Sequence, residues 1–452
     1  MIRFTEENGA LIARSRNETI RIEGWGNNAL RVRTTLLKKL PRDAHALTEN
    51  VAHSAKVTID EGSETAEIVN GKIKATVNGV GIICFYKDNE LILQEYYSYY
   101  YGSVRKEAIC YKIRSREYKG LASDDFKITV RFESDPKEKL FGMGQYQMPI
   151  LDLKGSVLPL EQRNSQVSVP FVVSNKGYGM LWNNPSTGEA AFGTNITKWI
   201  SDESDMVDYW ITADDTPAQI VTNYTECVGR APVMSKDYLG LWQCKLRYRT
   251  PDEVLEVARK YKELGIRLDV IVIDFFHWPH QGDWRFDEKY WSKDAVKAMT
   301  DELHAMGTKV MVSVWPSVDK RSENYYEMEQ KALISTTDVG SVQTYDYEGD
   351  CGTVDFFNPE AQEFVWSKCK QNYRDWGIDL FWLDNSEPDS TKYDFENYRY
   401  YTGRGSKVGC EYPKKYVEAF YNGQEAEGDH EAVNLCRSAW VGSQKYRTLA
   451  VS

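Results

Sequence analysis

A cluster of carboxylates closes a short apolar run near residue 380. The run covers residues 378–383, and Asp384, Glu387 and Asp389 follow it directly. A nearly continuous apolar run is typical of a strand buried in a parallel sheet, and the C-terminal ends of such strands open into the site of a β/α barrel. Two carboxylates about 5 Å apart can cleave a glycosidic bond with retention, one as nucleophile and the other as acid/base.

A divalent metal site and a structural role are the alternatives for these carboxylates. Hard cations bind several oxygen ligands, but the spacing Asp-x-x-Glu-x-Asp does not match an EF-hand loop. No His-x-x-x-His pair is present to bind zinc. A single Asp after a strand is also common as a helix N-cap. The spacing favours paired-carboxylate chemistry, and we predict no metal and no other cofactor.

Three further apolar runs end in polar or aromatic side chains. The first ends in residues 243–248, the second in residues 274–278, and the third at Trp315-Pro316. Each of these residues alone is compatible with an ordinary loop. In a β/α barrel, however, residues from different strand ends converge on one pocket. The four strand ends together predict a single site.

Strands and helices alternate from residue 236 onward, and these elements position the site residues. The expected strands cover residues 239–246, 268–274, 309–315 and 378–384, and the expected helices cover 251–264, 294–306 and 359–376. Repeated β/α units imply a parallel sheet, and their number favours a (β/α)8-type barrel over an open doubly wound sheet. No Gly-rich phosphate loop follows a strand, which argues against a nucleotide site.

The first half of the chain has a different pattern. Short segments with alternating apolar and polar residues are separated by turn signals such as Asn70-Gly71 and Asn78-Gly79. This pattern predicts antiparallel hairpins and an N-terminal β-sandwich. We therefore predict two domains, a sandwich over residues 1–235 and a β/α barrel over residues 236–452.

Composition narrows the classes of partner. The net charge of −11 argues against nucleic acid and against an anionic membrane surface. The N-terminus has no long apolar stretch of a secretory signal, so we predict a cytoplasmic protein, and homo-oligomerisation is left open. Nine of the 13 Trp residues lie after residue 236, which suits either a sugar-binding pocket or a large core. Cys227, Cys244, Cys351 and Cys436 are expected to be reduced and mostly buried thiols.

The segment Trp382-x-Asp384-x-x-Glu387 resembles the nucleophile motif of glycoside hydrolase family 31, the retaining α-glucosidases and α-xylosidases. Six further segments also resemble this family, and they occur in the same order as in the family: residues 141–145, 169–179, 240–243, 268–274, 356–359 and 437–446. The resemblance implies a galactose-mutarotase-like sandwich before the barrel and an oligosaccharide or other glycoside as substrate.

The resemblance also implies roles for individual residues. Asp384 would be the nucleophile and Glu387 a supporting carboxylate. The remaining members of the implied site bind substrate: Asp274, Arg437, Trp315, Trp382, Phe276 and Trp278. The first two would hold sugar hydroxyls, the next two would shape an apolar floor, and the last two would line the mouth.

Departures from the common α-glucosidase pattern point to one branch of the family. The Glu387-Pro388 form of the motif, with Trp278 and Asp283-Trp284, resembles the α-xylosidases. The resemblance implies that Trp278 and Trp284 lie near the sugar and exclude the CH₂OH group of glucose by their size. A loop rich in Tyr and acidic residues, 345–350, stands where the family often has Trp-Pro. The resemblance therefore implies α-xylosides as substrates, with α-glucosides and α-galactosides as alternatives.

The family's acid/base Asp lies in a Trp-Ser-Gly-Asp motif just after the stretch that matches residues 437–446, and the sequence ends at Ser452. We therefore expect a C-terminally truncated barrel with little or no activity. The rival interpretations are a non-catalytic carbohydrate-binding fragment, a related lyase or transglycosylase, and a metal-dependent barrel hydrolase.

Overall fold

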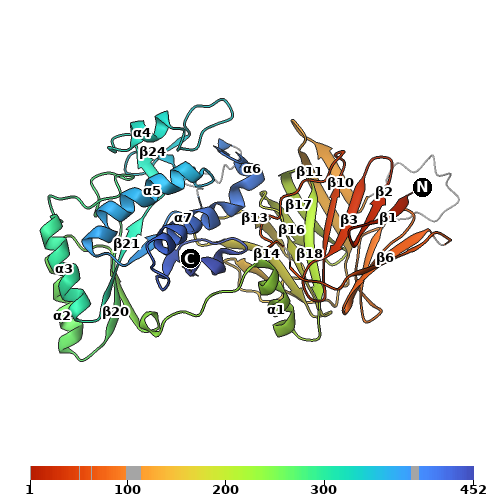
Figure 1. Ribbon diagram of the computed structural model, residues 1–452, viewed down its shortest axis with the longest axis horizontal. Helices are drawn as coiled ribbons and strands as arrows, with labels where there is room; N and C mark the ends of the chain where they lie inside the picture. Colours follow the sequence, from red (N-terminus) through yellow and green to blue (C-terminus); the bar gives the residue numbers. More distant parts are fainter. Residues whose placement is uncertain (1, 50, 63, 98–113, 388–396, 452) are drawn as a thin grey trace. The chain divides into compact units, whose positions relative to one another are not determined.

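The computed structural model describes residues 2–49, 51–62, 64–97, 114–387 and 397–451 of the chain (Figure 1). They form two compact units. The sandwich unit comprises residues 1–161 and 168–230, and the barrel unit comprises residues 162–167 and 231–452. A short segment within the first half of the sequence thus belongs to the barrel unit. The single domain boundary expected between residues 235 and 236 stays a prediction.

Alternating side chains in the sandwich unit build antiparallel hairpins. In β6 (Thr65–Asn70) and β7 (Ile73–Val77), buried and partly exposed side chains alternate, as in a sheet with one face on a core. Asn70 pairs with Ile73 across the turn, and Gly71 has φ +62°, a left-handed conformation that glycine adopts without steric cost. The hairpin expected at Asn70-Gly71 is confirmed.

Three sheets make up the sandwich unit (Figure 1). The eight-stranded sheet has the order β1 (Arg3–Glu7), β2 (Ala10–Arg14), β3 (Thr19–Gly24), β4 (Ala29–Thr35), β18 (Val207–Ala213), β15 (Tyr178–Trp182), β14 (Val167–Ser174) and β12 (Leu140–Gln145). The first five-stranded sheet has the order β10 (Arg116–Gly120), β11 (Phe126–Glu133), β17 (Ile196–Ser204), β16 (Gly188–Phe192) and β13 (Val157–Leu160). The second has the order β5 (Lys56–Asp60), β6, β7, β8 (Ile83–Lys87) and β9 (Glu90–Gln94).

One hydrophobic core joins these three sheets. Fully buried side chains from each of them meet there, among them Val32, Ile68 and Trp199. The ring of Tyr209 packs edge-on against Phe132 at a centroid distance of 5.8 Å. Helix α1 (Pro217–Val228) packs on β15 and β18. The N-terminal β-sandwich expected from the sequence is therefore confirmed.

The barrel unit is built on a six-stranded parallel sheet. Its order is β19 (Leu241–Lys245), β20 (Leu268–Ile273), β21 (Lys309–Val314), β25 (Leu380–Leu383), β28 (Asn434–Cys436) and β29 (Thr448–Ala450). Its longer helices are α2 (Pro251–Glu263), α3 (Lys293–Ala305), α5 (Pro359–Asn372) and α7 (Tyr412–Ala426). Within the described residues β19 and β29 are the two edges of the sheet and do not pair. The sheet is thus an incomplete β/α barrel, as predicted.

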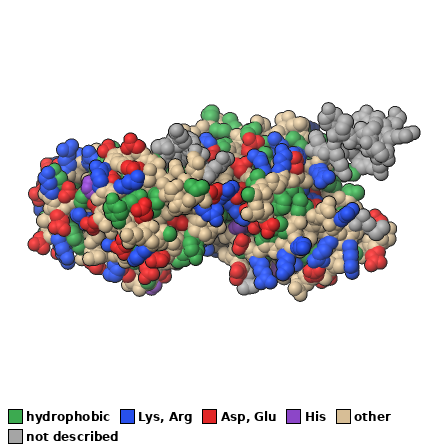
Figure 2. All heavy atoms as spheres, turned by 90° about the horizontal axis from the view of Figure 1, so that it is seen from above, with side chains coloured by type: hydrophobic (Ala, Val, Ile, Leu, Met, Phe, Trp, Pro, Cys, Tyr) green, Lys and Arg blue, Asp and Glu red, His purple; other side chains and the backbone are tan. Residues whose placement is uncertain are grey.

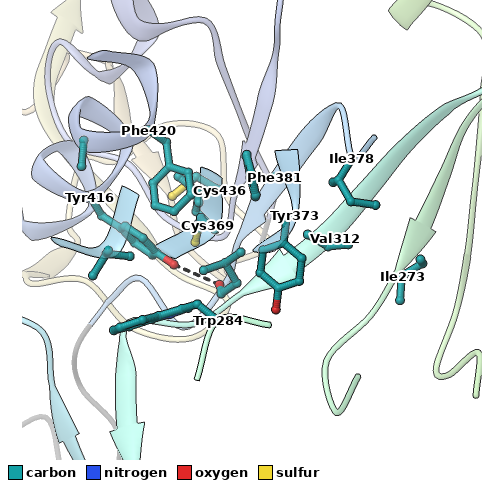
Figure 3. Close-up of a cluster of buried hydrophobic side chains, with 14 of the residues drawn as sticks. Ile273, Trp284, Val312, Cys369, Tyr373, Ile378, Phe381, Tyr416, Phe420 and Cys436 are labelled. Atoms are coloured by element: carbon teal, nitrogen blue, oxygen red, sulfur yellow. Dashed lines mark hydrogen bonds between the residues drawn. The ribbon is translucent and has the colours of Figure 1, made fainter. Parts of the chain in front are cut away.

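The two faces of this parallel sheet bury different sets of side chains. Ile273, Val312 and Phe381 belong to the apolar cluster of the helix-covered face, which also includes side chains of α2, α3, α5 and α7 (Figure 3). There the hydroxyl of Tyr416 donates to the carbonyl of Val314 at 3.0 Å. The opposite, inner face carries the second apolar cluster of the sheet: Val270, Val272, Met311, Leu380, Trp242, Trp382, Leu435 and Leu449.

The smaller elements of the barrel unit have weaker sequence signals. They are η2 (Lys236–Tyr238), β22 (Ser317–Asp319), α4 (Tyr325–Gln330), β23 (Thr344–Asp346), β24 (Asp350–Thr353), η3 (Arg374–Trp376), β26 (Arg399–Tyr400), β27 (Gly403–Arg404), α6 (Gly405–Val408), η5 (Gly409–Glu411) and η6 (Ser443–Tyr446). The helix expected over 359–376 ends early: α5 stops at Asn372, and Gly377 is left-handed at φ +100°, which ends the following 3₁₀ turn.

The molecular surface mixes both signs of charge. In Figure 2, Lys and Arg side chains are interspersed with Asp and Glu side chains. No helix among the described residues is both long enough and apolar enough to span a lipid bilayer.

Candidate active site

The register of the parallel strands brings four of the predicted residues to one face. Side chains two positions apart share a face of a strand. Val272 pairs with Met311, Ser313 pairs with Trp382, and Trp382 pairs with Leu435, all on the inner face. The next residue on this face lies two positions further along each strand. These next residues are Asp274, Trp315, Asp384 and Arg437. They therefore lie together at the C-terminal end of the sheet.

Asp384 is a buried carboxylate at the end of β25. The residue is only 6% exposed. Its backbone N–H donates to the carbonyl of Val314 at 3.0 Å, so the sheet continues by one residue beyond β25. Oδ1 lies 3.2 Å from Nη1 of Arg437. This contact is an ion pair without hydrogen-bond geometry, and Oδ1 has no hydrogen-bond partner among the described residues. A positive charge therefore lies beside this oxygen.

Arg437 divides its guanidinium between two carboxylates. Its Nε donates to both oxygens of Glu387 at 2.9 Å, and its Nη2 donates to Glu387 Oε2 at 2.6 Å. The same Nη2 reaches Asn385 Oδ1 at 3.0 Å. Glu387 is fully buried, and this fork-shaped cation is its bidentate partner. Glu387 thereby fixes the orientation of Arg437, which in turn faces Asp384.

The turn after Asp384 is held by buried hydrogen bonds. Asn385 has φ +51°, an uncommon backbone conformation that Asn tolerates better than most residues. Its Nδ2 donates to the hydroxyl of Tyr345 at 3.1 Å. Ser386 Oγ accepts from the backbone N–H of Ser438 at 3.0 Å, and Ser438 Oγ donates to Gln162 Oε1 at 3.1 Å. The strand end is therefore rigid on both sides of Asp384.

Asp274 is a second buried carboxyl at the end of β20. Burial, together with the negative charge of Asp384, raises the pKa of Asp274 to about 6, although the N–H of Phe275 donates to it at 2.7 Å. His277 braces the same turn: its Nδ1 lies 3.0 Å from the Asp274 carbonyl and its Nε2 lies 2.9 Å from the hydroxyl of Tyr373. Burial lowers the pKa of His277 to about 4, so this ring is neutral at pH 7.

We predict that Asp274→Asn changes the pH dependence of stability. The raised pKa means that the folded state favours protonated Asp274, so this contribution to stability is present below pH 4 and is lost as the pH rises through about 6. The variant escapes this loss, and its free energy of unfolding relative to wild type should rise by about 2 kcal/mol between pH 4 and pH 7. Urea unfolding at both pH values measures the difference, and a pH-independent difference would contradict the prediction.

The predicted aromatic residues form one connected group. Trp315 is 8% exposed; Phe275 stacks on it at 5.3 Å between ring centroids, and Trp278 meets it edge-on at 6.3 Å. Phe276 packs against Phe275 at 4.2 Å. Tyr347 also stacks on Trp315, at 5.5 Å and an interplanar angle of 21°. Trp315, Trp278 and Phe276 are thus brought together, and Trp315 connects them to Asp384 across the sheet.

Unpaired polar atoms mark the inner face beside these groups. Four of the buried polar atoms that lack a hydrogen-bond partner among the described residues belong to this face: Ser313 Oγ, Trp315 Nε1, Trp382 Nε1 and Asp384 Oδ1. A buried polar atom left without a partner costs about 1–3 kcal/mol. A ligand with several hydroxyl groups would satisfy them, so the donor and acceptor set suits a sugar.

Two expectations about side chains are wrong. Trp284 was grouped with Trp278 near the sugar, but it is 2% exposed and its Nε1 donates to the Trp315 carbonyl at 3.1 Å. It lies in the apolar cluster on the helix-covered face of the sheet (Figure 3), and it contacts Trp315 from that face. Cys244 was expected to be mostly buried but is exposed, and its Sγ lies 3.9 Å from Asp274 Oδ2. Burial of the thiol group itself and the nearby Asp274 raise the pKa of Cys244 to about 12.

Sequence reasoning missed other members of this site. Phe275, Tyr345 and Tyr347 carry ring or hydroxyl contacts to predicted residues, and Asn385 shares Arg437 with Glu387. The only available signal was the enrichment of Tyr and acidic residues in 345–350. Pro388 and Asp389 of the motif lie outside the described residues. No group of three or more His, Cys, Asp or Glu side chains in the described part of the chain could hold a metal ion.

Two family models match the chain. Residues 231–449 match the glycosyl hydrolases family 31 TIM-barrel domain, and residues 19–190 match the glycosyl hydrolase 31 N-terminal galactose mutarotase-like domain. A relative from Pseudescherichia vulneris, named uncharacterized family 31 glucosidase ORF2, is 45% identical over 100% of this chain and 86% of its own length. The chain belongs to glycoside hydrolase family 31. It is thus related to enzymes that hydrolyse glycosidic bonds.

Other family 31 proteins similar to this chain are named as α-xylosidases. Alpha-xylosidase A of Aspergillus niger is 31% identical, with 95% of this chain and 63% of the relative covered. A crystal structure of a family 31 α-xylosidase from a soil metagenome, complexed with xylose, is 44% identical with a TM-score of 0.93. That match covers 99% of this chain and 67% of the crystallised one. The chain therefore spans about two thirds of the length of these two proteins.

Proposed function

We propose that this chain carries the nucleophile and substrate-binding half of a retaining α-xylosidase active site. The observation that carries the proposal is the arrangement of Asp384 and Arg437 at adjacent strand ends. Asp384 Oδ1 faces the inner side of the sheet, 3.2 Å from Arg437 Nη1, and accepts no hydrogen bond from the described residues. A carboxylate in this state is suited to covalent catalysis.

In the proposed reaction, an Asp384 oxygen attacks the anomeric carbon of a terminal α-linked sugar. The bond from that carbon to the leaving oxygen breaks, the leaving oxygen takes a proton from the acid/base carboxyl group of a retaining enzyme, and a β-glycosyl ester forms on Asp384. Attack of water on the anomeric carbon from the opposite side then regenerates the carboxylate and releases the sugar with its original α configuration. The same acid/base group, a role that we assign to none of the described residues, takes a proton from the attacking water. Arg437 balances the charge of the Asp384 carboxylate before the first step and after the second.

Substrate binding is assigned to the residues around this carboxylate. Asp274 accepts hydrogen bonds from sugar hydroxyls when it is ionised. The unpaired Nε1 groups of Trp315 and Trp382 donate to sugar oxygens, and the apolar surface of Trp382 supports the ring from below. Phe276 packs on Phe275 and Trp278 packs on Trp315, so both rings border the same space.

A pentose is favoured over a hexose for two reasons. Relatives of this chain are named as α-xylosidases, and one was crystallised with xylose. Xylose lacks the exocyclic CH₂OH group of glucose, so a site closed by aromatic rings accepts it and excludes the larger sugar by shape. Trp278, which is 8% exposed and packed on Trp315, is the ring that we assign to this exclusion.

We predict that kcat/KM for an activated aryl α-xyloside exceeds that for the matching α-glucoside by at least about tenfold, since rejection of one small group is commonly worth ~1–3 kcal/mol. The same aryl group on both sugars keeps the leaving group constant. A preference for the glucoside or the galactoside would contradict the assignment. Binding of xylose without turnover of any glycoside would favour a non-catalytic carbohydrate-binding role.

A further inference from the structure

The hairpin between β23 and β24 presents an exposed ring beside the buried site. Asp346 pairs with Asp350 at the base of this hairpin, and residues 347–349 form its tip. Tyr347 is 43% exposed, whereas Asp274, Trp315 and Asp384 are 7%, 8% and 6% exposed. Its ring lies nearly parallel to that of Trp315. The hairpin tip therefore continues the aromatic surface of Trp315 outward to solvent.

Buried and charged groups hold the hairpin tip in place. The Nε2 of Gln281 donates to the Tyr347 carbonyl at 2.6 Å, and Ser317 Oγ donates to Gln281 Oε1 at 2.5 Å. Arg321 Nη2 donates to the Glu348 carbonyl at 2.8 Å. Gly349 has no room for a side chain, because a Cβ there would lie 1.8 Å from Asp319 Oδ2. An aromatic ring on such a support is pre-organised for binding.

The same hairpin is tied to the residue after the proposed nucleophile. The hydroxyl of Tyr345, in β23, accepts from Asn385 Nδ2 at 3.1 Å, and Asn385 follows Asp384 in the chain. Two independent contacts thus join the hairpin to the site: Tyr345 to the Asp384 turn, and Tyr347 to Trp315. The exposed ring of Tyr347 is consequently fixed relative to Asp384.

We propose that Tyr347 is a specificity-determining residue that stacks on the group beyond the scissile bond. The inference rests on the proposed function and adds a site for the leaving group. The sugar that is cleaved must reach the buried carboxylate, so the leaving group extends toward the exposed rim, where Tyr347 lies. The ligand is a sugar ring or another flat or ring-shaped aglycone, which offers a face to the tyrosine ring.

The test compares two α-xylosyl substrates that differ only in the leaving group. One is α-xylosyl fluoride, whose leaving group has no ring, and the other is an aryl α-xyloside with an acidic phenol. Neither leaving group depends strongly on protonation. Tyr347→Ala should lower kcat/KM for the aryl xyloside by about tenfold and leave that for the fluoride within about twofold, since one aromatic contact is worth ~0.5–1.5 kcal/mol. Tyr347→Phe should behave as wild type.

Tyr326→Ala is the matched control, because Tyr326 is a 69% exposed tyrosine on α4. It should change neither substrate. An equal fall for both substrates with Tyr347→Ala, or no fall for either, would overturn the inference, since the ring would then act only through Trp315 or not at all. Because both leaving groups depart without protonation, wild type should release them even with little activity on ordinary glycosides. Release of neither leaving group would reject the proposed function and the inference with it, whereas an unchanged ratio in an active enzyme rejects the inference alone.

Discussion

Replacing Asp384 by Asn should lower turnover of α-xylosyl fluoride by several orders of magnitude, because an amide cannot form the covalent ester. The substitution keeps the size of the side chain, and the backbone N–H of residue 384 still donates to Val314. With fluoride as the leaving group, the result reports on the nucleophile rather than on the acid/base. Intact-protein mass spectrometry during turnover should show a pentosyl adduct on the wild type and none on the variant.

Asp301→Asn, on the solvent side of α3, makes the same chemical change away from the site and should retain full turnover and the adduct. Peptide mapping should place the pentosyl group on the peptide that contains residue 384. Near-normal turnover by Asp384→Asn, or an adduct on another carboxylate, would remove Asp384 from the nucleophile role.

Replacing Arg437, the cation between Asp384 and Glu387, should lower the free energy of unfolding more than the other substitutions proposed for this protein. Arg437→Gln leaves Glu387 fully buried without its bidentate partner, and an uncompensated buried charge costs about 3–5 kcal/mol. Adding Glu387→Gln removes the stranded charge, so the double variant should be more stable than Arg437→Gln alone. Urea unfolding followed by tryptophan fluorescence measures both differences.

An exposed pair of the same geometry provides the control. Arg259 donates to Glu302 through Nε and Nη2, each at 2.7 Å, and both side chains are substantially exposed. Arg259→Gln should cost less than about 1 kcal/mol. Equal losses for Arg259→Gln and Arg437→Gln, or a double variant whose loss is the sum of the single ones, would show that burial of Glu387 does not set the energy of the pair.

Strand periodicity is the reason that much of the site could be predicted. Asp274, Trp315 and Asp384 each stand at the end of an apolar run, and the two-residue repeat of a strand places all three on one face. The elements of the barrel unit follow from local signals too: the Thr250 side chain caps α2, and Pro251 occupies its first position. The short strands β28 and β29 have three residues each, which is too few to show a pattern.

Residues on loops could not be placed in the same way. Trp278 and Trp284 are close in sequence, yet Gly282 and Trp284 both have positive φ, so the chain turns Trp284 into the core behind Trp315. Tyr347 reaches Trp315 only because Gln281, far away in sequence, fixes its carbonyl. Contacts of this range depend on the folded chain and leave no repeat in the sequence.

The segment 162–167 limits how this protein could be assembled from parts in evolution. It stands between two stretches of the sandwich unit, yet it belongs to the barrel unit. There Gln162 accepts from Ser438, next to Arg437, and donates to the Cys410 carbonyl at 3.2 Å. A gene crossover at residue 230 would transfer every strand end of the site and leave this buried amide behind. A barrel unit transferred without residues 162–167 would therefore leave Ser438 Oγ and the Cys410 carbonyl without their Gln162 contacts.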